Sequence, residues 1–508
     1  MLSFDSAFFM VLSKTDYLLY RECKKNAWLK INKPDVYYNH ELTAFEKMII
    51  QTGNEVELVA RGLFPTGILI EGRDSVAQKT TLGHIQNKQP VLFQAVFEKD
   101  GFLAAVDILE LNTETGAYAI NEVKSTNEID EKTHYYDLAF QVNLLRKCGI
   151  SIEKINLTHL NKEYVRNGSL NIIGLFQIED ITDKIESLCE EVLLEMDGAL
   201  SYLSQESLPE GHCTCVYKGR SKHCTCFITL NPDIPEYGIH DIARIGLSKK
   251  KLADLVDGKI FHIHDVPLHF TLSDIQQNQI DVHKLDKVII NKETIAKELQ
   301  ELQLPFYFLD YETLPCAIPR HDGFSPYQHI PFQYSLYVLE AFDAEPKLLE
   351  FLHADVNDPS SYFVNSLKSH IGDIGSVFVW HKSFECGRND EIVIRIPEMK
   401  EFIDSLNGRV FDLEEIFKKQ HYVHKGFRGS TSIKKILPIL APSLTYKELA
   451  IQDGGSAAEI WNRLSVEKLD EIEREKIIQN LKIYCGMDAY AMYAIWKELH
   501  NLVNQTQS

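Results

Sequence analysis

The sequence predicts an α/β protein with more than one domain. Its 508 residues are too many for one ordinary hydrophobic core, so we expect two or three domains. Apolar residues make up 44% of the chain and charged residues 25%, as is typical of folded proteins. Strand-like runs are interspersed with segments of helical periodicity. The turn-rich segment NPDIPEYG marks a boundary, and the predicted domains are residues 1–228, 229–304 and 305–508.

Two helices are predicted near the start of the first domain. Residues 13–31 show amphipathic periodicity, and either Ser13 or Thr15 can cap the N-terminus of this helix. The second helix spans residues 45–64 and carries Glu57. Both helices precede the first strand-like run of the domain.

Two strand-like runs in the first domain predict a β-hairpin. Residues 91–112 and 118–126 alternate in hydrophobicity and are joined by the turn-like NTETG. Asp107 lies in the first run, and Glu122 and Lys124 lie two residues apart on the second, hence on one face. These residues predict a metal site in which the lysine orients an attacking water or stabilises developing phosphate charge. A cross-strand charge pair on a solvated face is the alternative.

The third domain begins with the apolar, aromatic segment FYFLDYET, residues 306–313, which predicts a buried strand. Asp310 and Glu312 are two residues apart, so their side chains project from the same face. Two such carboxylates can hold a divalent cation, and two metal ions can clamp the oxygens of a phosphoryl displacement. Solvent-exposed acids at a strand end are the alternative.

Three later segments of this domain carry further acids. GSVFVWHKSFE predicts a strand followed by the start of a helix, with Glu385 at the end of the strand. RVFDLEEIF supplies Asp412 at a similar junction. The last long helix carries Tyr484 and Asp488, which are four residues apart and therefore share a helix face.

Ten cysteines in a chain expected to stay in the cytoplasm indicate metal or redox chemistry rather than disulfides. Four of them are packed into CTCVYKGRSKHCTC. The C-x-C spacing is tighter than the spacing usual at zinc, which favours an iron–sulfur cluster. Zinc is the alternative, with ligands drawn from these four thiols and two histidines: Cys213, Cys215, Cys224, Cys226, His212 and His223.

Composition sets limits on location and partners. The net charge of −20 does not exclude a nucleic-acid partner, because a nuclease needs carboxylates for its metals and only its groove must be basic. The sequence shows neither a charged-then-apolar leader nor an apolar run long enough to span a bilayer. We therefore expect a cytoplasmic protein without a membrane partner.

Basic segments are candidate contacts to a nucleic-acid backbone. In the connector, residues 249–251 are three lysines that follow a turn at Gly246, an arrangement vaguely like a helix–hairpin–helix element. In the third domain, residues 418–419 and 425–435 are the candidates. A helical spacer and ordinary solvated loops are the alternatives.

The motif order of the first domain resembles that of RecB-type PD-(D/E)xK nucleases. In that family, acids on two strands bind Mg²⁺ or Mn²⁺, and a helix glutamine contributes near the site. The resemblance assigns Asp107, Glu122 and Lys124 to the core motif and Gln141, in DLAFQ, to the helix position. Glu57, in G-x3-E, falls where many relatives have a histidine and is a further candidate ligand.

The cysteine arrangement is similar to that of a subset of RecB-like nucleases that carries a [4Fe–4S] cluster. In that subset one cysteine precedes the nuclease core and three follow it. The resemblance implies Cys23, Cys213, Cys215 and Cys224 as ligands, with Cys226 as the substitute. The cluster would then have a structural role, because it would link the first helix to the end of the domain.

The third domain resembles the DEDD 3′–5′ exonucleases of the ribonuclease H-like fold, in the branch with a Y-x3-D motif. The resemblance implies that Asp310, Glu312, Glu385 and Asp488 bind two Mg²⁺ or Mn²⁺ ions and that Tyr484 orients the attacking water. The third acid is normally Asp in an N-x3-F-D-like motif. Here the segment HKSFE has Glu in its place and His in place of Asn.

Segments such as LDYETLPCAIPRHDG, GSTSIKKILP and YCGMDAYAM resemble those of an uncharacterised bacterial family, and this resemblance spans nearly the whole chain. That family pairs an iron–sulfur RecB-like nuclease with an exonuclease-like domain. The resemblance implies a metal-dependent DNA nuclease with two active sites that acts on single strands or ends, in repair or defence against phage. An RNA 3′–5′ exonuclease and a binding module with one or both sites inactive are the alternatives. No GxxxxGK[ST] motif occurs, so a helicase would be a separate partner.

Overall fold

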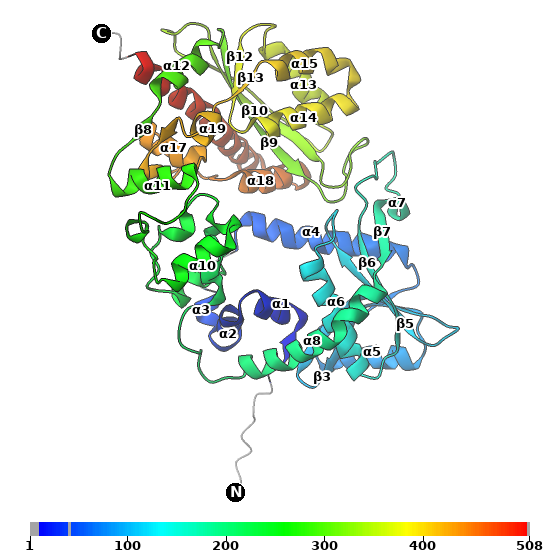
Figure 1. The fold of residues 1–508 in the computed structure, drawn as a ribbon. Coiled ribbons are helices and arrows are strands. Elements are labelled where there is room, and N and C mark those ends of the chain that lie inside the picture. The colour runs from blue at the N-terminus through cyan, green and yellow to red at the C-terminus, as the bar shows by residue number, and fades with distance from the viewer. Residues whose placement is uncertain (1–9, 39–41, 505–508) are drawn as a thin grey trace.

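A computed structural model describes residues 10–38 and 42–504 of the chain. The described residues form two large sheets, each with its own helices, in the lower and upper parts of the view in Figure 1. The observed class is mixed α/β, as the sequence predicts.

The first sheet has seven strands in the order β2-β3-β4-β5-β6-β7, with the short β1 beside β4. β5 and β6 are parallel, whereas β4 is antiparallel to both β3 and β5. Its strands are β1 (Leu12–Ser13), β2 (Ile68–Leu69), β3 (Val91–Lys99), β4 (Phe102–Leu111), β5 (Tyr118–Lys124), β6 (Ile152–Leu160) and β7 (Phe176–Asp180). The accompanying helices are α1 (Lys14–Glu22), α2 (Lys24–Asn32), α3 (Pro34–Tyr37), α4 (Ala44–Ala60), α5 (Ser75–Gln86), α6 (Glu131–Lys147), α7 (Ile172–Leu175) and α8 (Thr182–Leu203).

The strand-like run at residues 91–112 forms two strands rather than one. Asp100 and Gly101 have φ values of 52° and 81°, and they turn the chain so that β3 and β4 pair with each other. The predicted hairpin is the β4–β5 pair that follows. Turn chemistry at a single Asp-Gly step therefore overrides the continuous alternation of the sequence.

The helix predicted over residues 13–31 is interrupted. Cys23 has an extended backbone, with φ −159° and ψ 104°, and separates α1 from α2. Of the two proposed caps, Ser13 is the N-cap, because its Oγ accepts a hydrogen bond from the Asp16 N–H at 3.1 Å. The break places Cys23 at a corner between two helices rather than on a helix face.

Residues 204–304 link the two sheets without a large sheet of their own. The cysteine segment packs into one core with residues 239–280, so the predicted boundary at residue 228 crosses that core. Farther along, Ile295 and Leu299 pack into the core of the second sheet. The elements here are α9 (Phe227–Leu230), α10 (Lys249–Asp257), α11 (Asp274–Lys284), β8 (Ile289–Ile290) and α12 (Lys292–Gln300).

The second sheet has five strands in the order β11-β10-β9-β12-β13. β9, β12 and β13 are parallel, and β10 is antiparallel to β9 and β11. Its strands are β9 (Phe306–Pro315), β10 (His329–Leu339), β11 (Lys347–Leu352), β12 (Ser376–Val379) and β13 (Val410–Asp412). The other elements are α13 (Ser360–His370), α14 (Lys382–Arg395), α15 (Lys400–Gly408), α16 (Glu415–Lys418), β14 (Tyr422–Val423), α17 (Ile433–Leu440), α18 (Gly454–Val466) and α19 (Glu471–Asn504).

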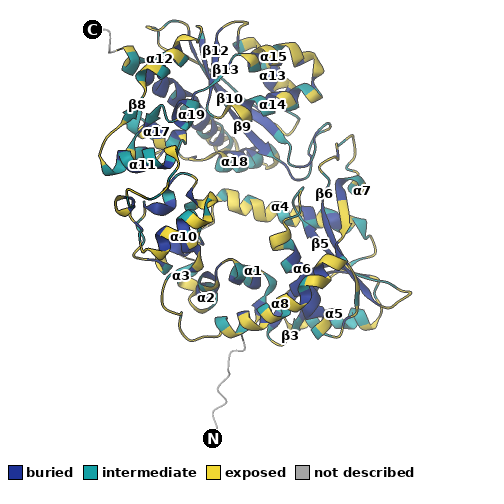
Figure 2. Ribbon diagram, viewed as in Figure 1, coloured by how far each residue is buried: buried dark blue, intermediate teal, exposed yellow. Residues whose placement is uncertain are grey.

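Both faces of the second sheet are covered. Phe306 and Phe308 pack with residues of α12, α17, α18 and α19 on one face. Tyr307 and Leu309 pack with α13, α14 and α15 on the other. This burial explains why β9 is a nearly continuous apolar run, and β9 is mostly dark blue in Figure 2.

Several contacts join the two halves of the protein, and two of them place the second sheet against the first. The loop that follows β9 is hydrogen-bonded to the loop between β6 and α7 of the first half. The Gly323 N–H donates to the Arg166 carbonyl at 2.8 Å, and the Arg166 N–H donates to the Phe324 carbonyl at 3.0 Å. The ring of Phe45, on α4, lies against Gly455 at the start of α18. The strand that carries Asp310 and Glu312 thus continues into a loop bound to the other half of the protein.

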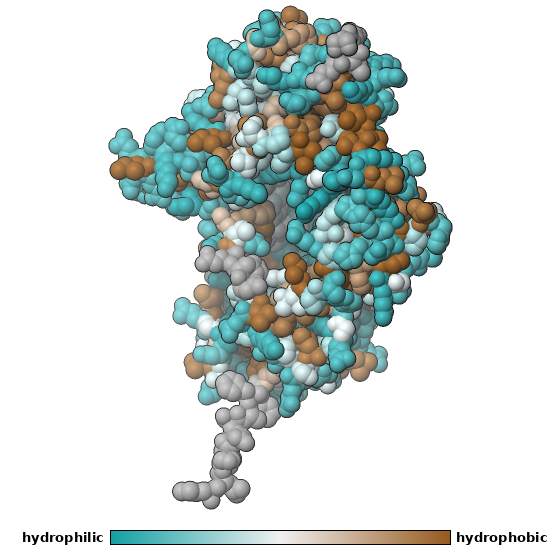
Figure 3. All heavy atoms as spheres, turned by 90° about the vertical axis from the view of Figure 1, so that its left-hand side faces the viewer, coloured by the Kyte–Doolittle hydropathy of each residue, from teal (hydrophilic) through white to brown (hydrophobic). Residues whose placement is uncertain are grey.

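The surface is mostly polar. Figure 3 shows one side, where hydrophilic residues predominate and hydrophobic residues form scattered groups around a hollow near the middle. Over residues 10–38 and 42–504, no helix combines the length and the apolar character needed to cross a bilayer.

Candidate metal and catalytic sites

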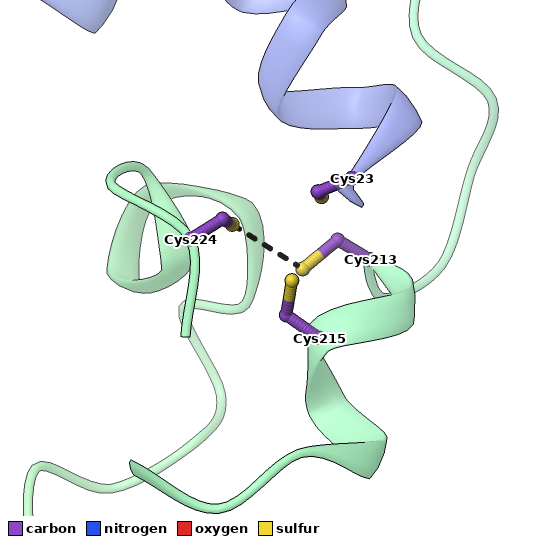
Figure 4. Close-up of side chains that lie close together, drawn as sticks. All are labelled: Cys23, Cys213, Cys215 and Cys224. Atoms are coloured by element: carbon purple, nitrogen blue, oxygen red, sulfur yellow. Dashed lines mark hydrogen bonds between the residues drawn. The ribbon is translucent and has the colours of Figure 1, made fainter. Parts of the chain in front are cut away.

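Four cysteines converge at one point between α1 and the segment after α8. The sulfur atoms of Cys23, Cys213, Cys215 and Cys224 all lie within 4.8 Å of one another, and all four side chains are buried. Figure 4 shows them pointing toward a common centre, with 3.9 Å between the sulfur atoms of Cys213 and Cys224. A cysteine set of this geometry can bind a metal.

The remaining candidates for this site have other partners. Cys226 packs in the core of the first sheet, and its N–H donates to Asn26 Oδ1 at 3.2 Å. His212 Nε2 lies 2.8 Å from an oxygen of Asp233. His223 stacks on Phe227 with 3.4 Å between ring centroids. The predicted set of four is therefore the one that the fold brings together.

Asn231 holds one of the four cysteines in place. It is fully buried, its Oδ1 accepts the Cys213 N–H at 3.0 Å, and its Nδ2 donates to Cys213 Sγ at 3.3 Å. Hydrogen bonds from the Cys215, Cys224 and Cys23 thiols lower the pKa of Cys213 well below the usual value. Both effects favour a thiolate, which is the form that binds metal.

The second group of polar residues, the N-terminal acid site, comprises Asp107, Glu122, Lys124, Asp137 and Gln141. Glu122 is 1% exposed, and its Oε1 accepts from Lys124 Nζ at 2.8 Å. Its Oε2 accepts from Gln141 Nε2 at 2.8 Å, so this glutamine of α6 lies at the site. Lys124 also donates to Asp137 at 2.6 Å. The site is a buried network, not a charge pair on a solvated face.

Lys14 is a member of this site that no local pattern signals. Its Nζ donates to Glu122 Oε1 at 2.7 Å and lies 3.8 Å from Asp137. Burial opposes the charge of Glu122, but the ammonium groups of Lys124 and Lys14 lower its pKa well below the usual range. Asp137 was also missed, although its position four residues before Gln141 puts both on one helix face.

Asp107 lies at the other side of the N-terminal acid site. Its Oδ2 accepts the Val123 N–H at 2.9 Å, and its Oδ1 accepts from Gln94 at 3.0 Å. Gln94 also donates to Glu57 at 2.6 Å, so this amide bridges Asp107 and Glu57. Burial, with Glu122 nearby, raises the pKa of Asp107 to about 7. Glu57 thus reaches the site, although Arg61 pairs with it at 2.7 Å.

The third group, the C-terminal acid site, comprises Asp310, Glu312, Glu385, Asp488 and Tyr484. Asp310 and Glu312 share one face of β9, as predicted. Burial and the Asp488 carboxylate raise the pKa values of both well above the ordinary range. Closely spaced buried carboxylates of this kind stay neutral or bind a cation.

Cys485 faces the same point. Its thiol lies 3.6 Å from Asp310 Oδ2, and the two residues with Glu312 form a group whose candidate ligand atoms lie within 4.8 Å of one another. Burial raises the pKa of Cys485 well above its usual value, so the group is a thiol rather than a thiolate.

Two further residues contact Tyr484 and Asp488: Tyr446, which the sequence does not signal, and Lys434, which lies in the candidate basic segment 425–435. Tyr446 is buried and its Oη donates to Asp488 Oδ1 at 2.6 Å. Lys434 Nζ donates to Tyr484 Oη at 3.3 Å. Both come from the segment between β13 and α19.

Glu385 occupies the first turn of α14 rather than the end of β12. It is 3% exposed, and its Oε2 has no hydrogen-bond partner among the described residues. Its charge contributes to the raised pKa of Asp310, yet its oxygens lie outside the compact group formed with Glu312 and Cys485. Asp412 accepts from the N–H groups of His381 and Lys382 at 3.1 and 3.0 Å, so it holds the start of α14.

Glu385 predicts a pH dependence of stability. Burial raises its pKa from 4.5 to about 8, so the folded protein retains a proton that the unfolded chain releases between these values. Its contribution is fully present below pH 4.5 and is lost as the pH rises through 8, at up to about 1.4 kcal/mol per pH unit. Denaturation from pH 5 to 8 without added divalent metal should show a shallower decline for Glu385→Gln. The exposed Glu398→Gln is the control, and equal slopes in all three proteins would refute the assignment.

Comparisons with known proteins give relatives without an assigned activity. Residues 307–432 match a family described as "Domain of unknown function (DUF2779)", a segment that ends before Tyr484. The chain is 28% identical over 216 residues to "Uncharacterized protein MG366" of Mycoplasma genitalium. The aligned region covers 39% of this chain and 32% of that protein. The chain is also 25% identical over 227 residues to "Uncharacterized protein UU173" of Ureaplasma parvum, with the same coverage. The match spans about a third of the length of these relatives.

Proposed function

We propose that the protein is a metal-dependent nuclease with two active sites, one at each acid site. The observation that carries this proposal is the C-terminal acid site. Glu312 and Asp488 are buried, Asp310 is partly buried beside them, and the pKa values of all three are raised. They come from two elements far apart in sequence. Buried like charges are costly unless a cation neutralises them, and hard divalent cations prefer carboxylate oxygens.

The topology supports a ribonuclease H-like assignment for the C-terminal half. If its five strands are numbered in chain order, they lie across the sheet in the order 3-2-1-4-5. The second strand, β10, is antiparallel to its neighbours β9 and β11. The acids come from the central strand, from the helix after the fourth strand and from the last helix. This order supports the resemblance to DEDD exonucleases with a Y-x3-D motif.

The N-terminal half supports a PD-(D/E)xK assignment. Asp107 and Glu122 are on adjacent strands, Lys124 follows Glu122 on the same face, and Gln141 reaches the site from α6. The surrounding network favours a different state for each acid, because Glu122 is held charged while the pKa of Asp107 is near neutrality.

The residues of the C-terminal acid site have separable roles in phosphodiester hydrolysis. Bound Mg²⁺ or Mn²⁺ would supply an activated water and stabilise charge on the leaving oxygen. Asp310, Glu312, Glu385 and Asp488 would hold the ions. Tyr484 would orient the water through its hydroxyl, and the hydrogen bond from Tyr446 fixes one oxygen of Asp488.

For the cysteine site we infer a [4Fe–4S] cluster, with zinc as the alternative. Four buried thiols at one point fit either group. The C-x-C spacing favours iron and sulfur. Its residues hold α1 against the segment after α8, so the role of the centre is structural.

One observation favours a second candidate, a nucleic-acid-binding module in which the N-terminal site is inactive. Both oxygens of Glu122 are already taken, by Lys14 and Lys124 on one side and Gln141 on the other. A metal would have to displace one of these donors. The N-terminal half would then bind DNA while cleavage takes place at the C-terminal acid site.

The test uses anaerobically purified protein with end-labelled single- and double-stranded DNA and RNA. We expect cleavage of DNA single strands or ends with Mn²⁺ or Mg²⁺ and none in the presence of a chelator. Preferred trimming of RNA would change the substrate class but not the chemistry. Absence of cleavage of every substrate in every metal would refute the nuclease proposal.

A further inference from the structure

Most basic side chains of the candidate backbone-contact segments are engaged in ion pairs within the protein. Lys418 pairs with Glu414 at 2.6 Å, and Lys425 pairs with Asp286. These pairs hold the loop between β13 and α17 against its neighbours. They leave less positive charge for a ligand than the sequence suggests.

Lys434 is arranged differently. It is the second residue of α17, and its ammonium lies over the rings of Tyr446 and Tyr484, 5.4 and 5.2 Å from their centroids. The faces of aromatic rings attract cations, so the two tyrosines fix the position of this charge. The fixed position is beside the C-terminal acid site.

The hydrogen bonds of Lys434 leave room for an anion. Its Nζ donates to the Gln452 carbonyl and to Tyr484 Oη, and a lysine ammonium has three N–H donors. Among the described residues, Lys434 forms no ion pair with a carboxylate. Burial raises the pKa values of Glu312 and Asp488, and the charge of Lys434 offsets part of that rise. The side chain is partly exposed, so a ligand can reach it.

We propose that Lys434 is an anion subsite that binds a phosphate of the substrate at the C-terminal acid site. The inference rests on the proposed nuclease function and adds a named contact to the substrate class. Once divalent ions neutralise Glu312 and Asp488, the ammonium is left as a positive charge with a free donor at the edge of the site. A phosphodiester oxygen next to the scissile bond is the ligand that fits this charge. Tyr446 is a positioning residue that holds both Lys434 and Asp488.

The test measures steady-state cleavage of a labelled single-stranded oligonucleotide in Mn²⁺ at several salt concentrations. All proteins carry Lys124→Ala, so that the C-terminal acid site dominates the measured cleavage. We expect Lys434→Ala to raise KM about tenfold with kcat changed less than threefold, because a charged hydrogen bond to the substrate is lost. The dependence of log(kcat/KM) on log salt should become shallower by about 0.7, the value for one phosphate contact on a single strand.

Two variants separate binding from structure. Lys434→Arg should keep most of the affinity, and Lys476→Ala, an exposed lysine on α19, should match the parent. If Lys434→Ala fails to fold by thermal melting, Lys434→Gln takes its place in the same assay. Equal KM and equal salt dependence for the Lys434 and Lys476 variants would overturn this inference and leave the nuclease proposal standing. A Lys124→Ala parent that cleaves nothing, beside a wild type that cleaves, would overturn the assignment of activity to the C-terminal acid site and the inference with it.

Discussion

Alanine at Asp310 is expected to lower cleavage at the C-terminal acid site by about 10³-fold, because a lost metal contact removes several kcal/mol of transition-state stabilisation. Asp310 lies in the middle of the site, within 4.8 Å of candidate ligand atoms on Glu312 and Cys485. Lys124→Ala is expected to lower cleavage at the N-terminal acid site by about 10²-fold, as for loss of one charge-stabilising donor. Product patterns on end-labelled DNA measure both effects.

The two variants should remove different products, because the two acid sites are on separate sheets. Asp404→Ala, a surface acid on α15 that pairs with Lys400 at 2.9 Å, is the control and should cleave like wild type. If Asp310→Ala removes all cleavage, the N-terminal half is a binding module that carries the cysteine site. If neither variant alters any product, the assignment of both sites is wrong.

The second large effect concerns the cysteine site. Cys213→Ser is expected to remove the bound metal centre and to lower the thermal midpoint of the N-terminal half by more than about 10 °C. Structural metals contribute on the order of 10 kcal/mol to folding, and metal binding is coupled to it. Metal analysis and visible absorption report the centre, while circular dichroism reports unfolding.

Loss of the centre should also affect catalysis unequally. Cys23 follows α1 directly, and α1 begins with Lys14, which donates to Glu122. We therefore expect Cys213→Ser to weaken cleavage at the N-terminal acid site more than at the C-terminal one. Cys226→Ser is the matched control and should retain the metal. Metal loss in this control equal to that of Cys213→Ser would contradict the assignment of the four ligands.

Local patterns in the sequence were sufficient for the parts of the sites that lie on single elements. Asp310 and Glu312 project together because side chains of a strand repeat every two residues. Tyr484 and Asp488 are one helical turn apart on α19. The choice of Cys23 with three later cysteines came from the resemblance, since no local period relates residues almost 200 positions apart.

Local patterns gave wrong element boundaries where the chain turns within a continuous periodic segment. Alternation continues through residues 91–112, but the left-handed backbone at Asp100 and Gly101 divides it into two strands. Helical periodicity likewise continues past Cys23, where the chain is extended. A periodic pattern indicates which side chains are buried, but it does not indicate where the chain turns between two buried segments.

The sequence by itself determined the class of the fold, the strand and helix that carry the acids, and the residue types available for metal binding. Only the tertiary structure decided which side chains complete each site. Lys14 meets Glu122 across 108 positions, Lys434 meets Tyr484 across 50 and Tyr446 meets Asp488 across 42. Such contacts depend on how helices pack on a sheet, and no periodicity within one segment encodes that packing.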